Sequence, residues 1–84
     1  MERLRRQLDS SFHPSELDIQ DDGMQHIGHA HEGRGHFSVR IVAPAFATQS
    51  QLQRHRMIYA ALGNLLQTDI HALSIKALAP GELR

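Results

Sequence analysis

Cysteine and tryptophan are both absent from this 84-residue sequence. Without cysteine, the chain cannot form a disulfide and cannot supply a thiolate ligand to a metal. Aromatic residues are scarce as well, with three Phe and one Tyr, so aliphatic side chains must fill the core. The length suits one small domain, which we expect to span residues 1–84.

Net charge and long apolar runs are also lacking. Nine Lys and Arg are balanced by nine Asp and Glu, which argues against a protein whose affinity comes mainly from neutralising nucleic-acid phosphates. No apolar run is long enough to span a bilayer, and the first ten residues, MERLRRQLDS, lack the apolar core of a signal peptide. We therefore expect a cytoplasmic protein without a membrane partner.

The apolar pattern predicts the element order helix, strand, strand, helix, strand. The predicted segments are a helix over 2–12, strands at 17–20 and 36–42, a helix over 53–66 and a strand at 73–77. The first two strands are expected to pair around a flexible loop at about 21–35, and a tail is expected from about residue 80. A right-handed crossover makes the second and third strands parallel. The prediction is an α+β fold, a three-stranded mixed sheet with helices on one face, in the helix-first variant of the KH topology.

The helix predicted over 53–66 is expected to be the main packing element. Ser50 and Gln53 have the spacing of a capping box at its start. Its core-facing side is predicted to carry apolar residues at helical spacing, namely Tyr59, Leu62 and Leu66, widened by Met57, Ile58, Ala61 and Leu65.

Histidine is the compositional outlier, with seven copies. His26, His29 and His31 lie in the glycine-rich stretch, and His36 follows at its exit. Imidazole is a common metal ligand near neutral pH, so a metal site, for example for zinc, is one reading of this spacing. A solvated loop tip is the other. His71, in the segment IHALSI, is either a ligand or a strand-edge residue hydrogen-bonded to backbone.

Catalytic signatures are missing. No Ser or Thr has a recognisable base-and-orienter pattern, and no phosphate-binding glycine loop is present. Nucleic-acid binding has one candidate surface, a small basic patch of Arg54, Arg56 and Lys76, although two such arginines more often simply solvate a helix start. The G-x-x-G clamp of KH domains is absent, because no two glycines are three residues apart. We therefore expect a protein that is not an enzyme.

Three segments resemble the BolA family: HFSVRIVAPAF at 36–46, QRHRMIYAAL at 53–62 and IHALSIKALAP at 70–80. The resemblance runs from about the first helix to Pro80, and the RHR-x-x-Y run followed by IHALSI is its most specific part. The family's helix, two strands, helical segment and strand agree with the element order predicted from the apolar pattern.

The resemblance also implies a partner and a cofactor. BolA-like proteins pair with monothiol glutaredoxins that carry a Cys-Gly-Phe-Ser motif, and the pair shares a [2Fe–2S] cluster with glutathione. The family's HAL histidine corresponds to His71, and its loop ligand corresponds best to His29, with His26 and His31 as alternates. The implied function is a non-enzymatic adaptor in cluster trafficking or in iron and redox sensing. The alternative implied by the family is a DNA-binding transcriptional regulator of stress response and cell morphology.

Histidine ligation has chemical consequences for such a cluster. Two neutral imidazoles in place of two thiolates make the cluster less anionic and raise its reduction potential. Ligation also becomes sensitive to pH, because a protonated imidazole cannot bind iron.

Overall fold

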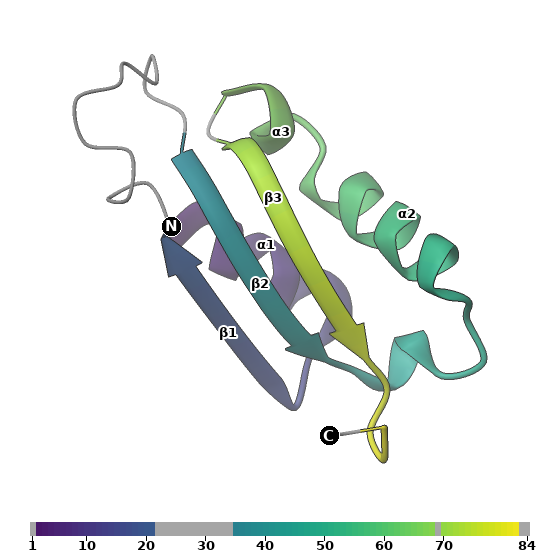
Figure 1. Cartoon of the computed structure of the whole chain (residues 1–84). Coiled ribbons are helices and arrows are strands. Elements are labelled where there is room, and N and C mark those ends of the chain that lie inside the picture. The colour runs from purple at the N-terminus through teal and green to yellow at the C-terminus, as the bar shows by residue number, and fades with distance from the viewer. Residues whose placement is uncertain (1, 22–34, 69, 83–84) are drawn as a thin grey trace.

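The computed structural model describes residues 2–21, 35–68 and 70–82. The elements in chain order are α1 (Glu2–Phe12), β1 (Glu16–Asp21), β2 (Gly35–Val42), the short 3-10 helix η2 (Pro44–Phe46), α2 (Gln51–Leu62), α3 (Leu65–Thr68) and β3 (Ile70–Leu78) (Figure 1). Among the described residues, no helix combines the length and the apolar character needed to cross a bilayer.

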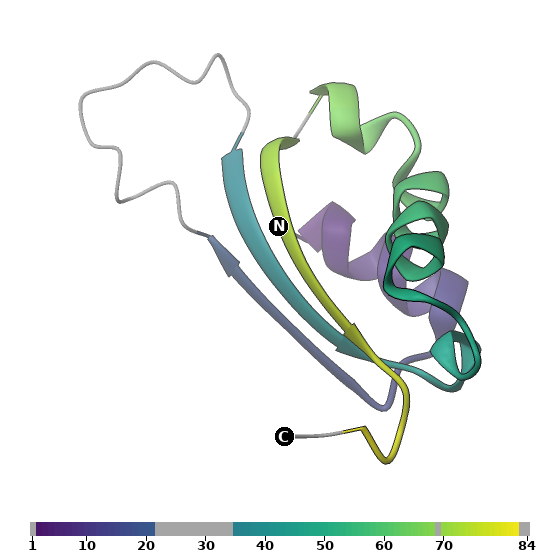
Figure 2. The ribbon, with the colours of Figure 1, turned by 45° about the vertical axis from the view of Figure 1, so that its right-hand side comes forward.

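The sheet has three strands in the order β1-β2-β3. β1 and β2 are antiparallel, whereas β2 and β3 are parallel across the connection that carries α2 and α3. The helices lie on one face of this sheet, and the other face is open (Figure 2). The predicted α+β fold, with its mixed sheet and its helices on one face, is therefore confirmed.

The core lies between β2 and the helices. Phe37, Val39 and Ile41 of the central strand are buried, while Ser38 and Arg40 between them are half-buried on the open face. This alternation follows from the two-residue period of a strand, as predicted. From the helical layer, α1 contributes Leu4 and Leu8, and η2 contributes Phe46, whose ring centroid lies 5.1 Å from that of Phe12.

The predicted helix over 53–66 is divided in two. The predicted serine cap is confirmed, because the Ser50 Oγ accepts a hydrogen bond of 3.1 Å from the Gln53 N–H, although the helix begins at Gln51, before the predicted residue 53. The prediction of one continuous helix is wrong, because α2 stops at Gly63, where φ is +52°. Glycine adopts this conformation at little cost, and the chain then turns into the short α3.

The predicted core face of the helix also needs correction. The fully buried residues of α2 are Arg54, Ile58 and Leu62, which follow one another at intervals of four. Tyr59 lies one position further round the helix and is 42% exposed, so its predicted place in the core is wrong. Beyond β3, the described chain continues in a turn to Glu82, past the expected start of the tail.

Candidate functional site

His71 is the second residue of β3 and coincides with an irregularity in the sheet. Gly35 of β2 pairs with Ile70, but His36 pairs with Ala72, so β3 has one extra residue at position 71. An extra residue of this kind is a β-bulge, a feature that is frequent next to functional sites because it changes the direction of a side chain. The histidine selected from the sequence therefore occupies an exceptional backbone position.

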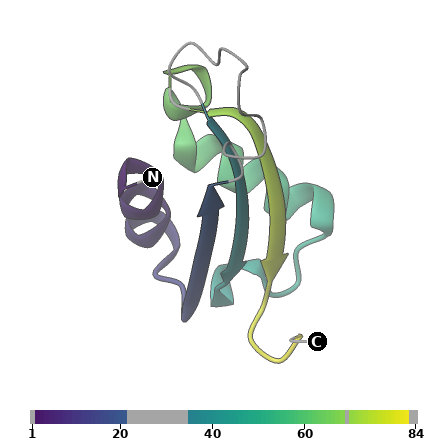
Figure 3. The same ribbon diagram turned by 60° about the vertical axis from the view of Figure 1, so that its left-hand side comes forward.

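The histidine-rich segment begins and ends at the same end of the sheet. β1 ends at Asp21, which pairs with Phe37, and β2 begins at Gly35, which pairs with Ile70. The end of β1 and the starts of β2 and β3 all lie at this end, as Figure 3 shows. The candidate ligands His26, His29 and His31 lie outside the described residues. Both of their points of attachment to the fold are therefore near His71 in the sheet.

His36 lies at this end too. It is half-buried on β2 and pairs with Ala72, the residue after the bulge. Over the ranges 2–21, 35–68 and 70–82, no group of three His, Cys, Asp or Glu side chains is arranged to hold a metal ion. The described part of the chain does not complete a metal site by itself.

Arg54, a candidate for nucleic-acid binding, is buried in the structure. Its residue is 4% exposed, and its guanidinium donates to Glu82 through two bonds, Nη1 to Oε1 at 2.7 Å and Nη2 to Oε2 at 2.9 Å. Nε donates to the Gln49 carbonyl at 2.9 Å, and Nη1 also donates to the Ala77 carbonyl at 3.0 Å. Hydrogen bonding to Glu82 raises the pKa of Arg54 above its ordinary value, although burial opposes this. The prediction that Arg54 belongs to an exposed basic patch is wrong.

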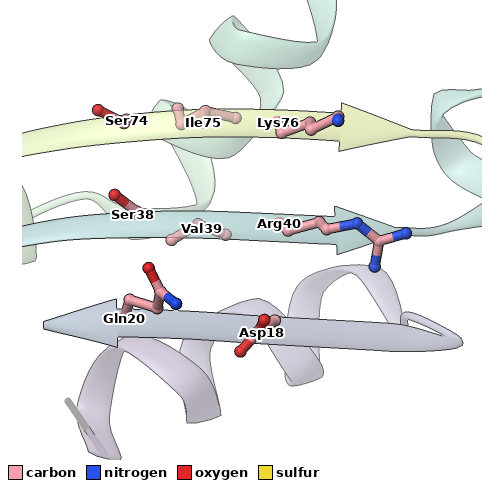
Figure 4. A pocket seen from close by; sticks show the side chains of 8 residues that line it. All are labelled: Asp18, Gln20, Ser38, Val39, Arg40, Ser74, Ile75 and Lys76. Atoms are coloured by element: carbon pink, nitrogen blue, oxygen red, sulfur yellow. The ribbon is translucent and has the colours of Figure 1, made fainter. Parts of the chain in front are cut away.

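Arg56 and Lys76 do not form a patch either. Arg56 is exposed on α2, in the helical layer, whereas Lys76 is exposed on the opposite, open face of the sheet. There Lys76 is cross-strand neighbour to Arg40, which is in turn neighbour to Asp18 (Figure 4). The three residues border a hollow of about 310 Å³ that Val39 and Ile75 also line. Arg40 there is also paired with Glu16 at 2.7 Å, so part of its charge is compensated.

Sequence reasoning missed the Arg54–Glu82 pair, although one signal for it exists. Arg54 occupies the position four residues before Ile58 and eight before Leu62, which is the buried stripe of α2. A charged residue on such a stripe requires a partner that balances its charge and accepts its hydrogen bonds. Glu82 supplies it, and its Oε1 also accepts from the Ala79 N–H at 3.0 Å.

The family follows from comparison with known proteins. A family model described as BolA-like protein matches residues 8–82, so this chain belongs to the BolA-like family. The BolA domain of SufE1 from Arabidopsis thaliana has the same fold, with a TM-score of 0.86 and 43% identity over 98% of this chain and 93% of that domain. Yeast Fra2 is more distant, with a TM-score of 0.69 and 26% identity over 96% of this chain and 80% of that one.

The curated relatives differ in length and in what their names state. SufE-like protein 1 of Arabidopsis thaliana is 41% identical over 96% of this chain, but the match covers only 24% of that protein. The chain likewise spans 53% of the chloroplastic protein BOLA1 from the same plant. The DNA-binding transcriptional regulator BolA of Escherichia coli K12 is 36% identical over 88% of this chain and 70% of the relative.

Proposed function

We propose that this BolA-like chain is a non-enzymatic adaptor that holds a [2Fe–2S] cluster jointly with a monothiol glutaredoxin and glutathione. The observation that carries the proposal is the β-bulge at His71, at the end of the sheet where the histidine-rich segment is attached. A ligand on the first residues of a strand has a fixed position in the fold. A second ligand from the attached segment then completes the chain's contribution.

The donor set fits a shared cluster better than a resident one. The chain has seven histidines and no cysteine, so its candidate iron ligands are imidazole nitrogens and not thiolates. A [2Fe–2S] cluster needs four ligands, and thiolates are its usual ones. His71 and His29, with His26 and His31 as alternates, would bind one iron, and the cysteine of the glutaredoxin and the glutathione thiol would bind the other. When bound, such a cluster supplies one-electron chemistry at a potential raised by its histidine ligands.

Reconstitution tests this proposal. We expect the chain, mixed with a Cys-Gly-Phe-Ser glutaredoxin, glutathione, ferric iron and sulfide without oxygen, to give a one-to-one heterodimer that carries the cluster. The measurement is size-exclusion chromatography with absorbance at the visible cluster bands, followed by electron paramagnetic resonance of the reduced sample. The chain alone, treated in the same way, is the control. Elution of this chain as a colourless species, separate from a cluster-bearing glutaredoxin, would contradict the proposal.

DNA binding is the second candidate function, and the name of the Escherichia coli relative favours it. The charges weigh against a strong autonomous interaction, because Arg54 is buried and Arg56 and Lys76 lie on opposite sides of the sheet. A protein with few phosphate contacts has a shallow dependence of affinity on salt.

A salt titration separates the two functions. If the adaptor role is the relevant one, we expect binding to a duplex, followed by fluorescence anisotropy, to be weak and to change less than about tenfold between about 50 and 200 mM salt. Tight binding with a steep salt slope that falls in the Arg56→Ala or Lys76→Ala variants would instead support the regulator.

A further inference from the structure

β3 is an edge strand whose outer side carries unpaired backbone groups. The Ala43 N–H donates to the Leu78 carbonyl at 3.0 Å, so Leu78 directs its backbone groups toward β2. Because successive residues of a strand alternate, the backbone N–H and C=O of Leu73, Ile75 and Ala77 are directed away from β2. The Ala77 carbonyl accepts from Arg54. No hydrogen bond within the described ranges reaches the outward groups of Leu73 and Ile75.

The side chains of Leu73 and Ile75 are also incompletely covered on the core side of β3. Their partners on β2, Phe37 and Val39, are buried, at 8% and 2% exposure. Leu73 and Ile75 point into the same core but are only half-buried. A strand added outside β3 would cover these apolar side chains as well as pairing their backbone groups.

The opposite edge of the sheet is protected in a way that β3 is not. β1 has three acidic residues among its six, Glu16, Asp18 and Asp21, and Arg5 donates to the Leu17 carbonyl at 3.4 Å. Charge and covered carbonyls are the usual means of preventing edge pairing. The regular part of β3, after the bulge, has Lys76 as its one charged residue. Of the two edges of the sheet, the one at β3 therefore has less protection against pairing with another strand.

We propose that the outer edge of β3 binds an extended peptide segment that alternates apolar and acidic residues. Its backbone pairs with Leu73 and Ile75, in the mode known as β-augmentation. Its apolar residues lie on the core side, beside Leu73 and Ile75. Its acidic residues lie on the open face, beside Ser74 and Lys76, where Lys76 provides positive charge.

A second whole copy of the chain is a poorer occupant than a peptide. Two copies paired edge to edge about a two-fold axis would place their helices on the same face of one continuous sheet. α2 runs alongside β3 on that face and reaches beyond it (Figures 1 and 2). The two α2 helices would then compete for the same space above the junction. A single extended segment carries no helix that would meet α2, so it avoids this conflict.

The probe is an acetylated and amidated peptide of sequence Thr-Val-Glu-Val-Glu-Val-Thr, titrated into labelled protein and followed by NMR. We expect the amide signals of Leu73 and Ile75 to shift and their hydrogen exchange to slow at least about tenfold, with a dissociation constant of about 100 µM. The amides of Ala72 and Ser74 already face β2, so their protection is the internal reference. Absence of change at Leu73 and Ile75 at millimolar peptide would refute the proposal.

Two further comparisons distinguish pairing from non-specific adhesion. The same peptide with N-methyl groups on the amides that face β3 must lose binding, because it cannot donate to the edge. The Lys76→Glu variant must weaken binding about tenfold and prefer the peptide in which lysine replaces glutamate. Gln20→Glu adds a negative charge to the same face at the β1 edge, and it must leave the affinity unchanged. Equal binding of the methylated peptide, or indifference to Lys76→Glu, would overturn the proposal.

Discussion

Replacing His71 with alanine is expected to abolish the cluster spectrum of the complex with glutaredoxin while leaving the fold intact. His71 is the extra residue of the β3 bulge, so it makes no cross-strand pair whose loss would weaken the sheet. Of the proposed ligands, His71 is the one that lies in a strand. Without it, the remaining histidine alone cannot hold iron with comparable affinity. The measurements are the visible spectrum of the reconstituted complex and the circular dichroism of the free chain.

A more sensitive variant is His71→Cys. It restores an iron ligand but replaces a neutral donor with a thiolate, so we expect a cluster with a lower reduction potential and a spectrum closer to the all-thiolate form. His13→Asn is the matched control, because it removes a histidine at the other end of β1 and asparagine tolerates the φ of +47° found there. A wild-type spectrum from His71→Ala would show that His71 is not a ligand.

Replacing Arg54 with alanine is expected to lower the free energy of unfolding by about 3 kcal/mol. The change removes four hydrogen bonds, so the carbonyls of Gln49 and Ala77 lose the guanidinium donor. The Glu82 carboxylate loses its charged partner and keeps the hydrogen bond from the Ala79 N–H. It also leaves a cavity on the buried stripe of α2. Equilibrium unfolding in urea, followed by circular dichroism, measures the loss for a domain of this size.

The neighbouring Arg56 provides the control. Arg56 is exposed on the same helix, and Arg56→Ala should change the free energy of unfolding by less than about 0.5 kcal/mol. Glu82→Gln should cost about 1 kcal/mol, less than the loss of Arg54, because the Glu82 side chain is 42% exposed and water can replace part of the contact. If Arg54→Ala and Arg56→Ala were equally harmless, the Arg54–Glu82 pair would not stabilise the fold.

The architecture was predictable because its patterns are local. Alternation in β2 and the stripe of α1 identify the faces that are buried, and the handedness of crossovers then sets the direction of β3. Gly63 was harder to interpret. A glycine inside an apolar helical pattern is compatible with a continuous helix, and only the positive φ shows that the helix ends there.

The candidate site was predictable in part, and for a different reason. His71 was selected through the resemblance to a family, and the bulge at that position depends on strand register, which composition and periodicity do not reveal. The burial of Arg54 depends on Glu82, which is distant in sequence and lies where a tail was expected. Tertiary structure sets pairings of this kind. The three residues of the predicted basic patch are therefore not together on the surface of the folded protein.

The Arg54–Glu82 contact has a consequence for synthesis of the chain. A ribosome delivers α2, with its arginine, well before the turn that follows β3. Until that turn has emerged, the Arg54 guanidinium lacks the Glu82 carboxylate, and burying its unpaired charge would cost free energy. The nascent domain is therefore expected to stay open on its β3 side, and final closure should wait for the last turn to leave the exit tunnel.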